Sequence, residues 1–554
     1  MGNTTRLTPL KKPKTEFSYN FRLMNTTIPD PPTPSSQIEI LDAAPPVMRR
    51  PLALIAGHTY AAVWLYVRVS DPAQSSHLEP THLQRFILRD DGALFGAGGD
   101  TPLQDLEIDV ALPETPEQSR TWSAAGVKAY RAGARPHPVQ VFQQIAAVVN
   151  RFVDFDRSLA GQQTMAELVA CYVLATWFLP AFDVVGYLWV TGERGSGKTV
   201  LLHTVTEMAY LGHVLLAGGS YASLRDLTEY GATLAFDDAE NLTKLHGSDA
   251  DKRALLLAGN RCGSTVTIKE RDPGNGQRTR HINAFCPRLF SAIQVPDNVL
   301  ASRSIVIPLV RTPDRDCANA DPLDPEAWPH DRRQLLDDLW ALALACLPQL
   351  RCYEKAVNEK AHLFGRDLEP WRALLAVALW LDTLDTAGTL HRPLDPAWPS
   401  IPGMPSTTGL WDRLHALSSR YQQEKRDLEA GNITYLVVLA LCACARSATR
   451  ATNVENTPYP AGLAPDSALL HSFTVTVQDV FAYAVAISMR QGNDAENITE
   501  SRVGRALGRL RLEKVPRPGG TGSRRWRITL DQVQRLAQAH GIDFHPQSRI
   551  MPGI

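Results

Sequence analysis

The spacing of hydrophobic residues changes several times along this chain, and each change marks a segment. Residues 1–47 are polar and rich in proline, a composition typical of a disordered leader. In residues 48–135, short apolar runs with β-branched and aromatic residues are separated by glycine and proline breaks, including the hairpin signal Asp91-Gly92. This alternation predicts a small β-rich N-terminal domain.

The middle of the chain has a different spacing of hydrophobic residues. Apolar residues recur every three or four positions in 139–152 and 165–178, which predicts a helical segment over 136–184. Strand-like and helical runs then alternate over 185–312, as in a parallel sheet with helices on its faces. Helical periodicity dominates 313–451. We therefore predict an α/β core followed by a helical lid and further helices.

The last segment, residues 468–546, combines helices with a basic, glycine-rich hairpin. Residues 501–527 hold eight arginines and one lysine against one acid, Glu513. An arginine-faced helix, a hairpin and a further helix are typical of a winged-helix-like DNA-binding domain, in which the helix lies in a groove and the hairpin contacts phosphates. A solvated face, or a docking surface for another protein, is the alternative. The expected DNA contacts are Arg502, Arg505, Arg509, Arg524, Arg525 and Arg527.

Composition limits the class of protein. The 554 residues are 44% hydrophobic and 21% charged, which indicates a globular protein with a sizeable core. The net charge of −1 means that an argument for nucleic acid must rest on local clusters. The segment from Met165 to Val190 is the nearest to a membrane span, but Pro180 breaks it and Glu167 and Asp183 interrupt it, so a buried helix and strand explain it better. We expect a soluble, cytoplasmic protein with no membrane partner.

The clearest motif is a phosphate loop between an apolar strand and a helix. In the pattern Gly-x4-Gly-Lys-Thr, glycines let backbone N–H groups surround phosphates, and the following helix directs its positive end at them. Lys198 should reach the β- and γ-phosphates, and the Thr199 hydroxyl should coordinate Mg²⁺. The motif predicts ATP with magnesium, although GTP is also compatible with it. The predicted nucleotide-binding residues are Gly192, Glu193, Arg194, Gly195, Ser196, Gly197, Lys198 and Thr199.

A second apolar strand ends in acids, about forty residues after the loop. Placed beside the phosphate-loop strand, it would bring Asp237 next to the metal ion. Asp238 or Glu240 would then polarise the attacking water, and Asp238 is one methylene shorter than the glutamate usual in such ATPases. Taken alone, the acidic pair could equally cap a helix.

Between Ser264 and Arg280 the sequence predicts a hairpin with basic residues near its tip. Such point charges suffice for contact with a nucleic-acid backbone regardless of its sequence. A solvated hairpin without a partner is the alternative. The residues that would contact DNA are Lys269, Arg271, Arg278 and Arg280.

The order of these motifs resembles the AAA+ P-loop ATPases. Within them it is similar to the minichromosome-maintenance-like branch, and to uncharacterised ATPase and helicase domains of phage, plasmid and cassette-element replication proteins. The resemblance covers residues 140–385. The stretches that carry it are Phe155–Leu159, Thr176–Phe178, the phosphate loop, Asp237–Glu240 and Leu300–Arg311.

The resemblance implies roles for further residues. Ser291 would be the sensor-1 residue and Arg303 the arginine finger, which reaches the γ-phosphate of a neighbouring subunit. Arg366 falls where the helical lid of such enzymes presents its sensor-2 arginine. A finger acting across an interface implies self-association into a ring, such as a hexamer. A primase or another replication protein is a further partner that the resemblance suggests.

The preferred interpretation is a ring-forming ATPase that acts as a helicase or translocase on single-stranded or forked DNA in a phage, plasmid or mobile-element replication system. The alternative is a nucleotide-switched DNA-binding regulatory or defence ATPase without processive unwinding. A DNA-binding scaffold with a relic site is a third class, which the intact Lys198, Thr199 and Asp237 argue against.

Overall fold

The computed structural model describes most of the chain between residues 44 and 544. The described residues are 44–68, 81–112, 116–215, 221–239, 250–272, 276–293, 298–389, 407–429, 433–454, 472–490, 498–510, 512–515 and 524–544. The chain divides into the units Met1–Pro46 and Val47–Ile554. The predicted leader over 1–47 therefore lies almost entirely outside the described residues.

A small antiparallel sheet forms the N-terminal part of the second unit. Its strands, in spatial order, are β2 (Leu52–Ile55), β3 (His58–Arg68), β4 (Thr81–Arg89) and β5 (Leu94–Phe95), while β1 (Val47–Met48) pairs in parallel with β6 (Asp109–Val110). The predicted turn at Asp91-Gly92 joins β4 to β5, and Gly92 has a φ of 90°, which favours glycine. Trp64 belongs to a small local core, whereas Val63, on the other face of β3, belongs to the main core.

Three helices precede the central sheet: α1 (Ala124–Arg131), α2 (Pro138–Phe152) and α3 (Gln162–Trp177). The last two match the predicted helical stretches. Every residue of α3 from Met165 to Trp177 is buried. This burial explains its apolar circumference, because a helix enclosed by protein needs no polar face. No described helix is both long enough and apolar enough to cross a membrane.

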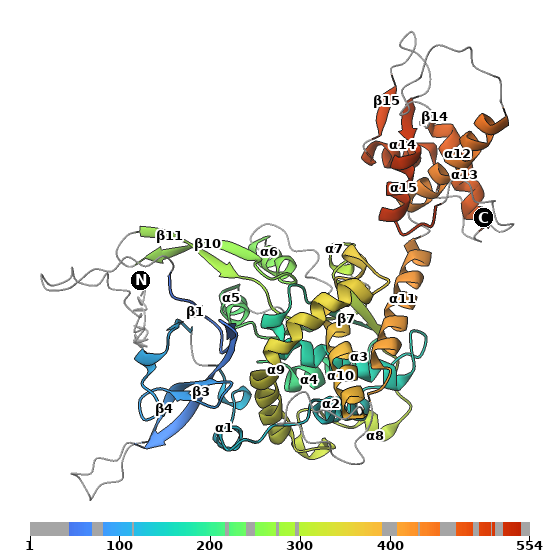
Figure 1. The fold of residues 1–554 in the computed structure, drawn as a ribbon. Coiled ribbons are helices and arrows are strands. Elements are labelled where there is room, and N and C mark those ends of the chain that lie inside the picture. Colours follow the sequence, from blue (N-terminus) through green and yellow to red (C-terminus); the bar gives the residue numbers. More distant parts are fainter. Residues whose placement is uncertain are drawn as a thin grey trace, which may run out of the picture. The chain divides into compact units, whose positions relative to one another are not determined.

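Five parallel strands form the central sheet, and one of them, β7, is labelled in Figure 1. They are β7 (Tyr187–Thr191), β8 (His213–Leu215), β9 (Leu234–Phe236), β12 (Arg288–Ala292) and β13 (Ser304–Pro308), in the spatial order β13-β7-β12-β9-β8. The helices α4 (Lys198–Met208), α5 (Tyr221–Glu229), α6 (Ala250–Ala258) and α7 (Asn298–Ala301) fall between these strands in sequence. The predicted α/β core with a parallel sheet is confirmed.

One prediction about this sheet is wrong. The acidic strand β9 does not lie beside the phosphate-loop strand β7, because β12 lies between them and pairs with both. The sequence pattern shows that each strand is buried, but it does not reveal the order of the strands. Asp237 still comes to the same edge as the loop, because the carboxyl ends of parallel strands share one edge of a sheet.

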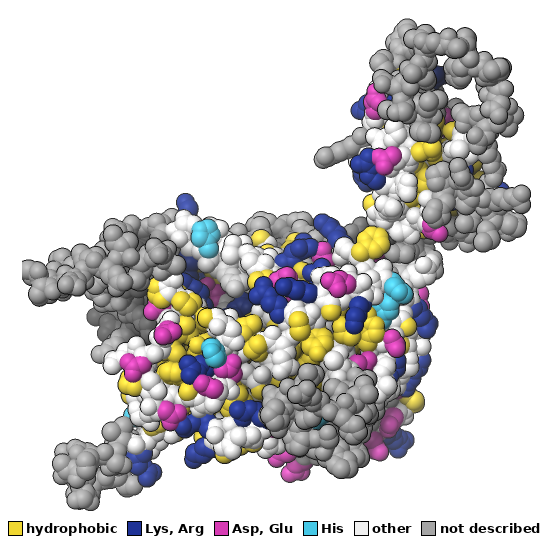
Figure 2. Space-filling model, in the orientation of Figure 1, with side chains coloured by type: hydrophobic (Ala, Val, Ile, Leu, Met, Phe, Trp, Pro, Cys, Tyr) yellow, Lys and Arg dark blue, Asp and Glu magenta, His cyan; other side chains and the backbone are white. Residues whose placement is uncertain are grey.

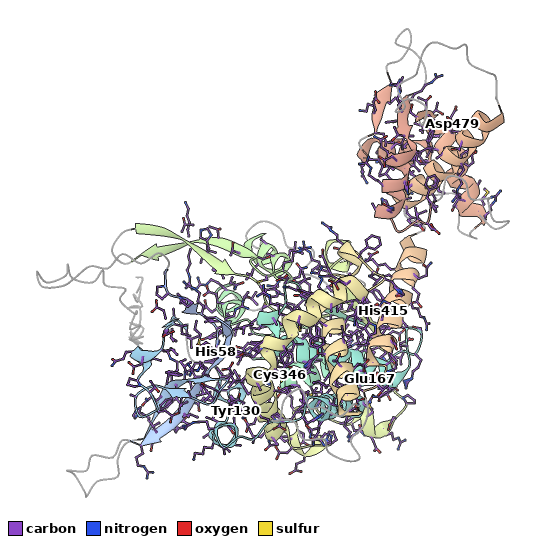
Figure 3. The ribbon with its side chains drawn as sticks, in the orientation of Figure 1. His58, Tyr130, Glu167, Cys346, His415 and Asp479 are labelled. Carbon is purple, nitrogen blue, oxygen red and sulfur yellow. The ribbon has the colours of Figure 1, made fainter. Side chains whose placement is uncertain are left out.

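The predicted basic hairpin consists of β10 (Thr265–Asp272) and β11 (Gly276–Asn283), which pair along their full lengths. Residues 273–275 at its turn lie outside the described residues. Helices follow the sheet: α8 (Arg315–Ala318), α9 (Arg332–Lys360), α10 (Arg372–Thr389) and α11 (Leu410–Glu429). Arg413 of α11 donates hydrogen bonds of 2.9 and 3.0 Å to the buried carboxylate of Glu167 on α3 (Figure 3). This ion pair attaches the helical part to the body of the α/β core.

The C-terminal elements have a hydrophobic core of their own. They are α12 (Ile433–Val454), β14 (Ser472–Thr476), α13 (Val477–Arg490), α14 (Glu500–Arg509), β15 (Glu513–Val515), β16 (Arg525–Thr529) and α15 (Leu530–Ala539). The sheet order is β14-β16-β15, all antiparallel. Helix α12 contributes Leu436 and Leu441 to this core, so the module begins before residue 468, where the sequence analysis placed its start.

Candidate nucleotide-binding site

The turn between β7 and α4 depends on its glycines. Gly195 and Gly197 have φ angles of 81° and 87°, in the left-handed region where a side chain is strained. At Gly192 an added Cβ would lie 2.6 Å from the carbonyl oxygen of Leu309, so a side chain does not fit there. Helix α4 begins at Lys198, and the N–H groups of its first turn have no partner within the helix. The turn therefore offers backbone donors and a positive helix end to an anion.

Two cationic side chains bind carbonyl groups of this loop. The Lys198 ammonium donates to the carbonyls of Gly192 and Glu193 at 2.8 and 3.0 Å. Arg311, three residues beyond β13, donates from Nε and Nη2 to the carbonyl of Arg194 at 3.0 and 2.6 Å. Arg311 was not predicted to act at this site, and its only signal in the sequence is its place just after the strand β13.

An acidic cluster from two further strands meets the start of α4. The Thr199 hydroxyl donates to Asp237 Oδ2 at 2.8 Å, and Ser291 Oγ on β12 donates to the other oxygen, Asp237 Oδ1. The backbone N–H of Asp238 points at the same group, 3.2 Å from Asp237 Oδ1 and 3.3 Å from Ser291 Oγ. Asp238 has a φ of 55°, a left-handed conformation that costs energy in a residue with a side chain. Glu240, the other candidate for orienting water, lies outside the described residues.

These groups face one cavity of about 680 Å³, a size typical of small-molecule sites. Lys198, Thr199, Asp237 and Asp238 form its polar side. The other lining residues were not predicted, because they come from the end of α2, the stretch after β13 and α8. These residues are Phe152, Val153, Asp154, Val310, Thr312, Cys317 and Ala318. The cavity thus combines charged residues of the loop and the acidic strand with apolar lining from Phe152, Val153 and Val310.

The donor set fits a magnesium ion. The Thr199 hydroxyl and the Asp237 carboxylate are oxygen ligands that lie 2.8 Å apart at the rim of the phosphate loop. Oxygen ligands of this kind, completed by phosphate and water, are what Mg²⁺ prefers.

Two predicted arginines lie away from this cavity. Arg303 directly precedes β13, whose Ser304 is paired with Tyr187 at the start of β7, and its guanidinium donates to the carbonyl of Leu257. Arg366 is exposed in the 3-10 turn Gly365–Asp367. This turn is followed by Pro370, which packs against the backbone of Gly186 at the same end of β7. Neither arginine lines the cavity of its own chain. The role of Arg303 as a finger toward a neighbouring subunit and the role of Arg366 as the sensor-2 residue of the lid both stay predictions.

The basic hairpin is only partly available to a ligand. The Lys269 side chain is exposed, but Arg280 forms an ion pair with Glu229 at the end of α5. Burial raises the pKa of the Glu229 carboxyl, and Arg280 opposes that shift. Arg280 therefore has a structural partner, which argues against its predicted contact with DNA. The side chains of Arg271 and Arg278 lie outside what the structure describes.

The predicted DNA-contacting arginines of the C-terminal module are exposed to solvent. Arg502, Arg505 and Arg509 are all exposed on α14, which buries Val503, Ala506 and Leu507 on its opposite side. On β16 the exposed Arg525 and Arg527 alternate with the buried Trp526 and Ile528, and Arg524 is exposed just before the strand. Arg527 also makes a cross-strand ion pair with Glu513 at 3.4 Å.

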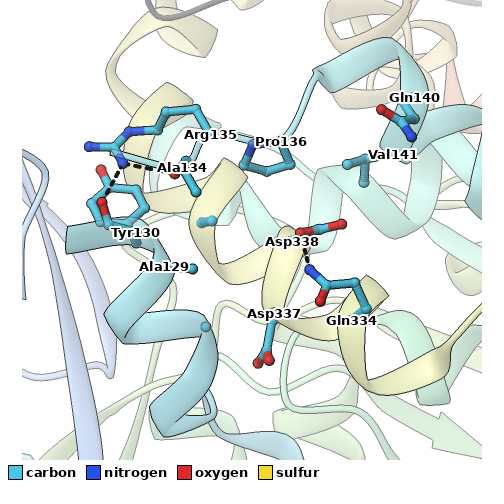
Figure 4. Close-up of a pocket in the computed structure, with 12 residues that line it drawn as sticks. Ala129, Tyr130, Ala134, Arg135, Pro136, Gln140, Val141, Gln334, Asp337 and Asp338 are labelled. Carbon is cyan, nitrogen blue, oxygen red and sulfur yellow. Dashed lines mark hydrogen bonds between the residues drawn. The ribbon is translucent and has the colours of Figure 1, made fainter. Parts of the chain in front are cut away.

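Lys and Arg side chains are interspersed with Asp and Glu on the face shown in Figure 2. A smaller cavity of about 180 Å³ lies between α1, α2 and α9 (Figure 4). Its acids are already paired within the protein, since Asp338 accepts from Gln334 at 2.8 Å and Asp337 binds Ser123 and Arg333.

No family model and no curated protein sequence matches the chain. Among solved structures, it is similar to a full-length MCM homologue from Methanopyrus kandleri, with 13% identity, a TM-score of 0.29, and coverage of 66% of this chain and 78% of that one. The C-terminal region of NrS-1 gives 10% identity, a TM-score of 0.25, and coverage of 80% and 93%. JCV helicase gives 16% identity, a TM-score of 0.19, and coverage of 55% and 64%.

TM-scores this low establish nothing about activity. The functional assignment therefore depends on the geometry of the phosphate loop and its acidic cluster.

Proposed function

We propose that this chain is an ATP-dependent DNA helicase or translocase that works as a ring in a phage, plasmid or mobile-element replication system. The observation that carries the proposal is the hydrogen bond between the Thr199 hydroxyl and the Asp237 carboxylate, next to the lysine of a phosphate loop and within one cavity. Residues 38 positions apart in sequence meet there in the arrangement that binds a metal-bound triphosphate.

The nucleotide would enter with its triphosphate on the loop and its base toward Phe152 and Val153. Lys198 would exchange the carbonyls of Gly192 and Glu193 for phosphate oxygens, and the N–H groups at the start of α4 would bind the same anion. Mg²⁺, held by Thr199 and Asp237, neutralises charge on the β- and γ-phosphates when it is bound.

Hydrolysis requires an oriented water, and Asp238, which lines the cavity, would take that role, with Glu240 as the alternative. The Asp238 carboxylate would accept a proton from water as the water oxygen attacks the γ-phosphorus. The bond from that phosphorus to the β,γ-bridging oxygen breaks, and the products are ADP and phosphate. Ser291 would fix the orientation of the Asp237 carboxylate, because its hydroxyl donates a hydrogen bond to Oδ1 of that group.

DNA would contact the exposed Lys269 on the hairpin and the exposed arginines of α14 and β16 in the winged-helix-like module. A helix with three arginines on one solvent-exposed side suits the polyanionic backbone of DNA. The position of Arg303 at the start of β13, outside the cavity of its own chain, supports the proposal that it acts on a neighbouring subunit, as a ring would allow.

A second candidate is a nucleotide-switched, DNA-binding regulatory or defence ATPase that does not unwind DNA processively. The side chain of Asp238 favours it, because a carboxylate one methylene shorter than glutamate holds the water less well and would slow turnover. In that case the ATP-bound state, rather than the hydrolysis cycle, would control DNA binding.

Two measurements on the full chain separate these candidates. ATPase turnover is measured with and without single-stranded DNA, and strand displacement is measured on a forked duplex. Stimulated ATPase with displacement is the expected result for a helicase. Stimulation without displacement would support the switch instead, and an absence of ATPase under every condition would defeat both.

A further inference from the structure

Arg288, the first residue of β12, is an arginine buried in the core, with an exposed fraction of 0%. Within the part of the chain that the structure describes, no carboxylate forms an ion pair with it. Its guanidinium donates instead to a hydroxyl and two backbone carbonyls, and it also interacts with the Cys286 side chain and lies over the Tyr187 ring. Burying a guanidinium without a counter-ion is costly, and an apolar side chain would avoid that cost. The position therefore calls for an explanation beyond packing.

The partners of Arg288 come from three different elements. Nη1 donates to Tyr187 Oη, at the start of β7, at 2.9 Å, and also to the carbonyl of Leu256 in α6. Nη2 donates to the carbonyl of Ala284, one residue after β11, at 3.0 Å. The fit is tight, because a Cβ at Gly259 would lie 2.2 Å from Arg288 Nη1.

These contacts are at the base of the hairpin. The N–H of Ala284 donates to the carbonyl of Ser264 at 2.8 Å, which closes the hairpin just below β10 and β11. Leu256 belongs to the helix that leads into β10. The guanidinium thus holds both the incoming and the outgoing side of the hairpin.

Arg288 is attached to two of the three strands that serve the nucleotide site, β12 and β7. Arg288 is three residues from Ser291 along β12, or about 10 Å at the rise of a strand. Ser291 in turn contacts Asp237 and the backbone of Asp238. Tyr187 begins the strand that ends at the phosphate loop. A buried strand is stiff, so a shift at either end is transmitted to the other.

We propose that Arg288 is a positioning residue that couples occupation of the nucleotide site to the position of the β10–β11 hairpin. The bond from Arg288 to Tyr187 joins the hairpin to the phosphate-loop strand, together with the bond that the Tyr187 hydroxyl donates to the carbonyl of Leu256 at 3.3 Å. This inference rests on the proposed function, because it assumes that the hairpin meets DNA while the loop binds ATP.

Two tyrosines provide a matched pair of variants. Tyr187 and Tyr172 are both fully buried, and both contact Arg288. The Tyr187 hydroxyl accepts from the guanidinium, whereas the Tyr172 hydroxyl donates to the Arg288 backbone carbonyl at 2.9 Å. Each Tyr→Phe change removes one buried hydroxyl near the same residue. Only Tyr187→Phe weakens the link between hairpin and loop.

The readout is the factor by which single-stranded DNA changes the Kd of a non-hydrolysable ATP analogue. By linkage, the analogue must change the Kd for DNA by the same factor, which gives an internal check. Tyr187→Phe should reduce this factor by about three- to tenfold, the range for changes within a coupling network, and leave each Kd measured alone nearly unchanged. Tyr172→Phe should keep the wild-type factor.

Arg288→Lys is the second variant, because it keeps the charge but cannot reach all three acceptors. It should lower the factor in the same direction as Tyr187→Phe. Equal factors for Tyr187→Phe, Tyr172→Phe and wild type would overturn the coupling role and leave the ATPase proposal intact. A wild-type chain that binds the analogue but shows no effect of DNA on its affinity would defeat the proposed motor together with the coupling.

Discussion

The strands of the central sheet have their carboxyl ends on one side, here called the carboxyl edge, and their amino ends on the other, the amino edge. Different functional residues lie at these two edges. At the carboxyl edge, the side chains of Lys198, Thr199, Asp237 and Asp238 converge on one cavity. At the amino edge, Arg303 lies near the start of β7 and binds a backbone carbonyl rather than a nucleotide group. The strand between the two edges is β7, whose five residues span about 16 Å.

This difference separates two kinds of motif. Residues close to the loop, in sequence or at the end of an adjacent buried strand, complete their site within one chain. An arginine on the opposite edge can reach a γ-phosphate only if that phosphate belongs to another copy of the chain. The geometry therefore makes self-association a requirement of the finger role, and the following changes test the two edges against each other.

The largest effect is expected at the amino edge. Arg303→Ala should lower turnover by on the order of 10³-fold or more, because an arginine finger stabilises charge that develops on the γ-phosphate. Arg351→Ala, an exposed arginine on α9, is the control and should change little. In mixtures with wild type, activity should fall faster than dilution predicts, and a strictly linear fall would rule out action across an interface.

A loss on the order of 10²- to 10³-fold is expected at the carboxyl edge from Lys198→Ala, which removes a preorganised cation from the phosphates. The exposed Lys128→Ala on α1 serves as control. The decisive measurement mixes Lys198→Ala with Arg303→Ala. If the two edges act in different subunits, some interfaces combine an intact loop with an intact finger, and ATPase activity returns. A mixture as inactive as its components would show that both residues act within one chain.

A smaller effect is expected from Arg311→Gln, which releases the carbonyl of Arg194. Loss of a charge-assisted hydrogen bond should raise KM for ATP by about tenfold while kcat changes less, because the loop is less well preorganised. Arg315→Gln on α8 is the nearby control. Since Arg311 serves the loop of its own chain, mixtures with wild type should lose activity in proportion to dilution. A loss of activity larger than dilution predicts would show that Arg311 acts across the interface between subunits.

Sequence alone determined the local parts of this protein. Hydrophobic periodicity indicated the parallel α/β core and the helices around it, because burial on one face or on both leaves a regular pattern along the chain. The phosphate loop was readable because its glycines, Lys198 and Thr199 are contiguous. Asp237 was predicted from an acidic strand end expected beside the phosphate-loop strand; that neighbour was wrong, but the residue still lies at the carboxyl edge of the same sheet.

Tertiary structure alone decided which segments meet. It placed β12 between β7 and β9, brought Arg311 onto the carbonyl of Arg194, and paired Arg280 with Glu229. It also assigned α12 to the C-terminal core. The physical reason is that a sequence pattern records how much of a segment is buried, whereas its partner is chosen by the packing of whole elements from distant parts of the chain.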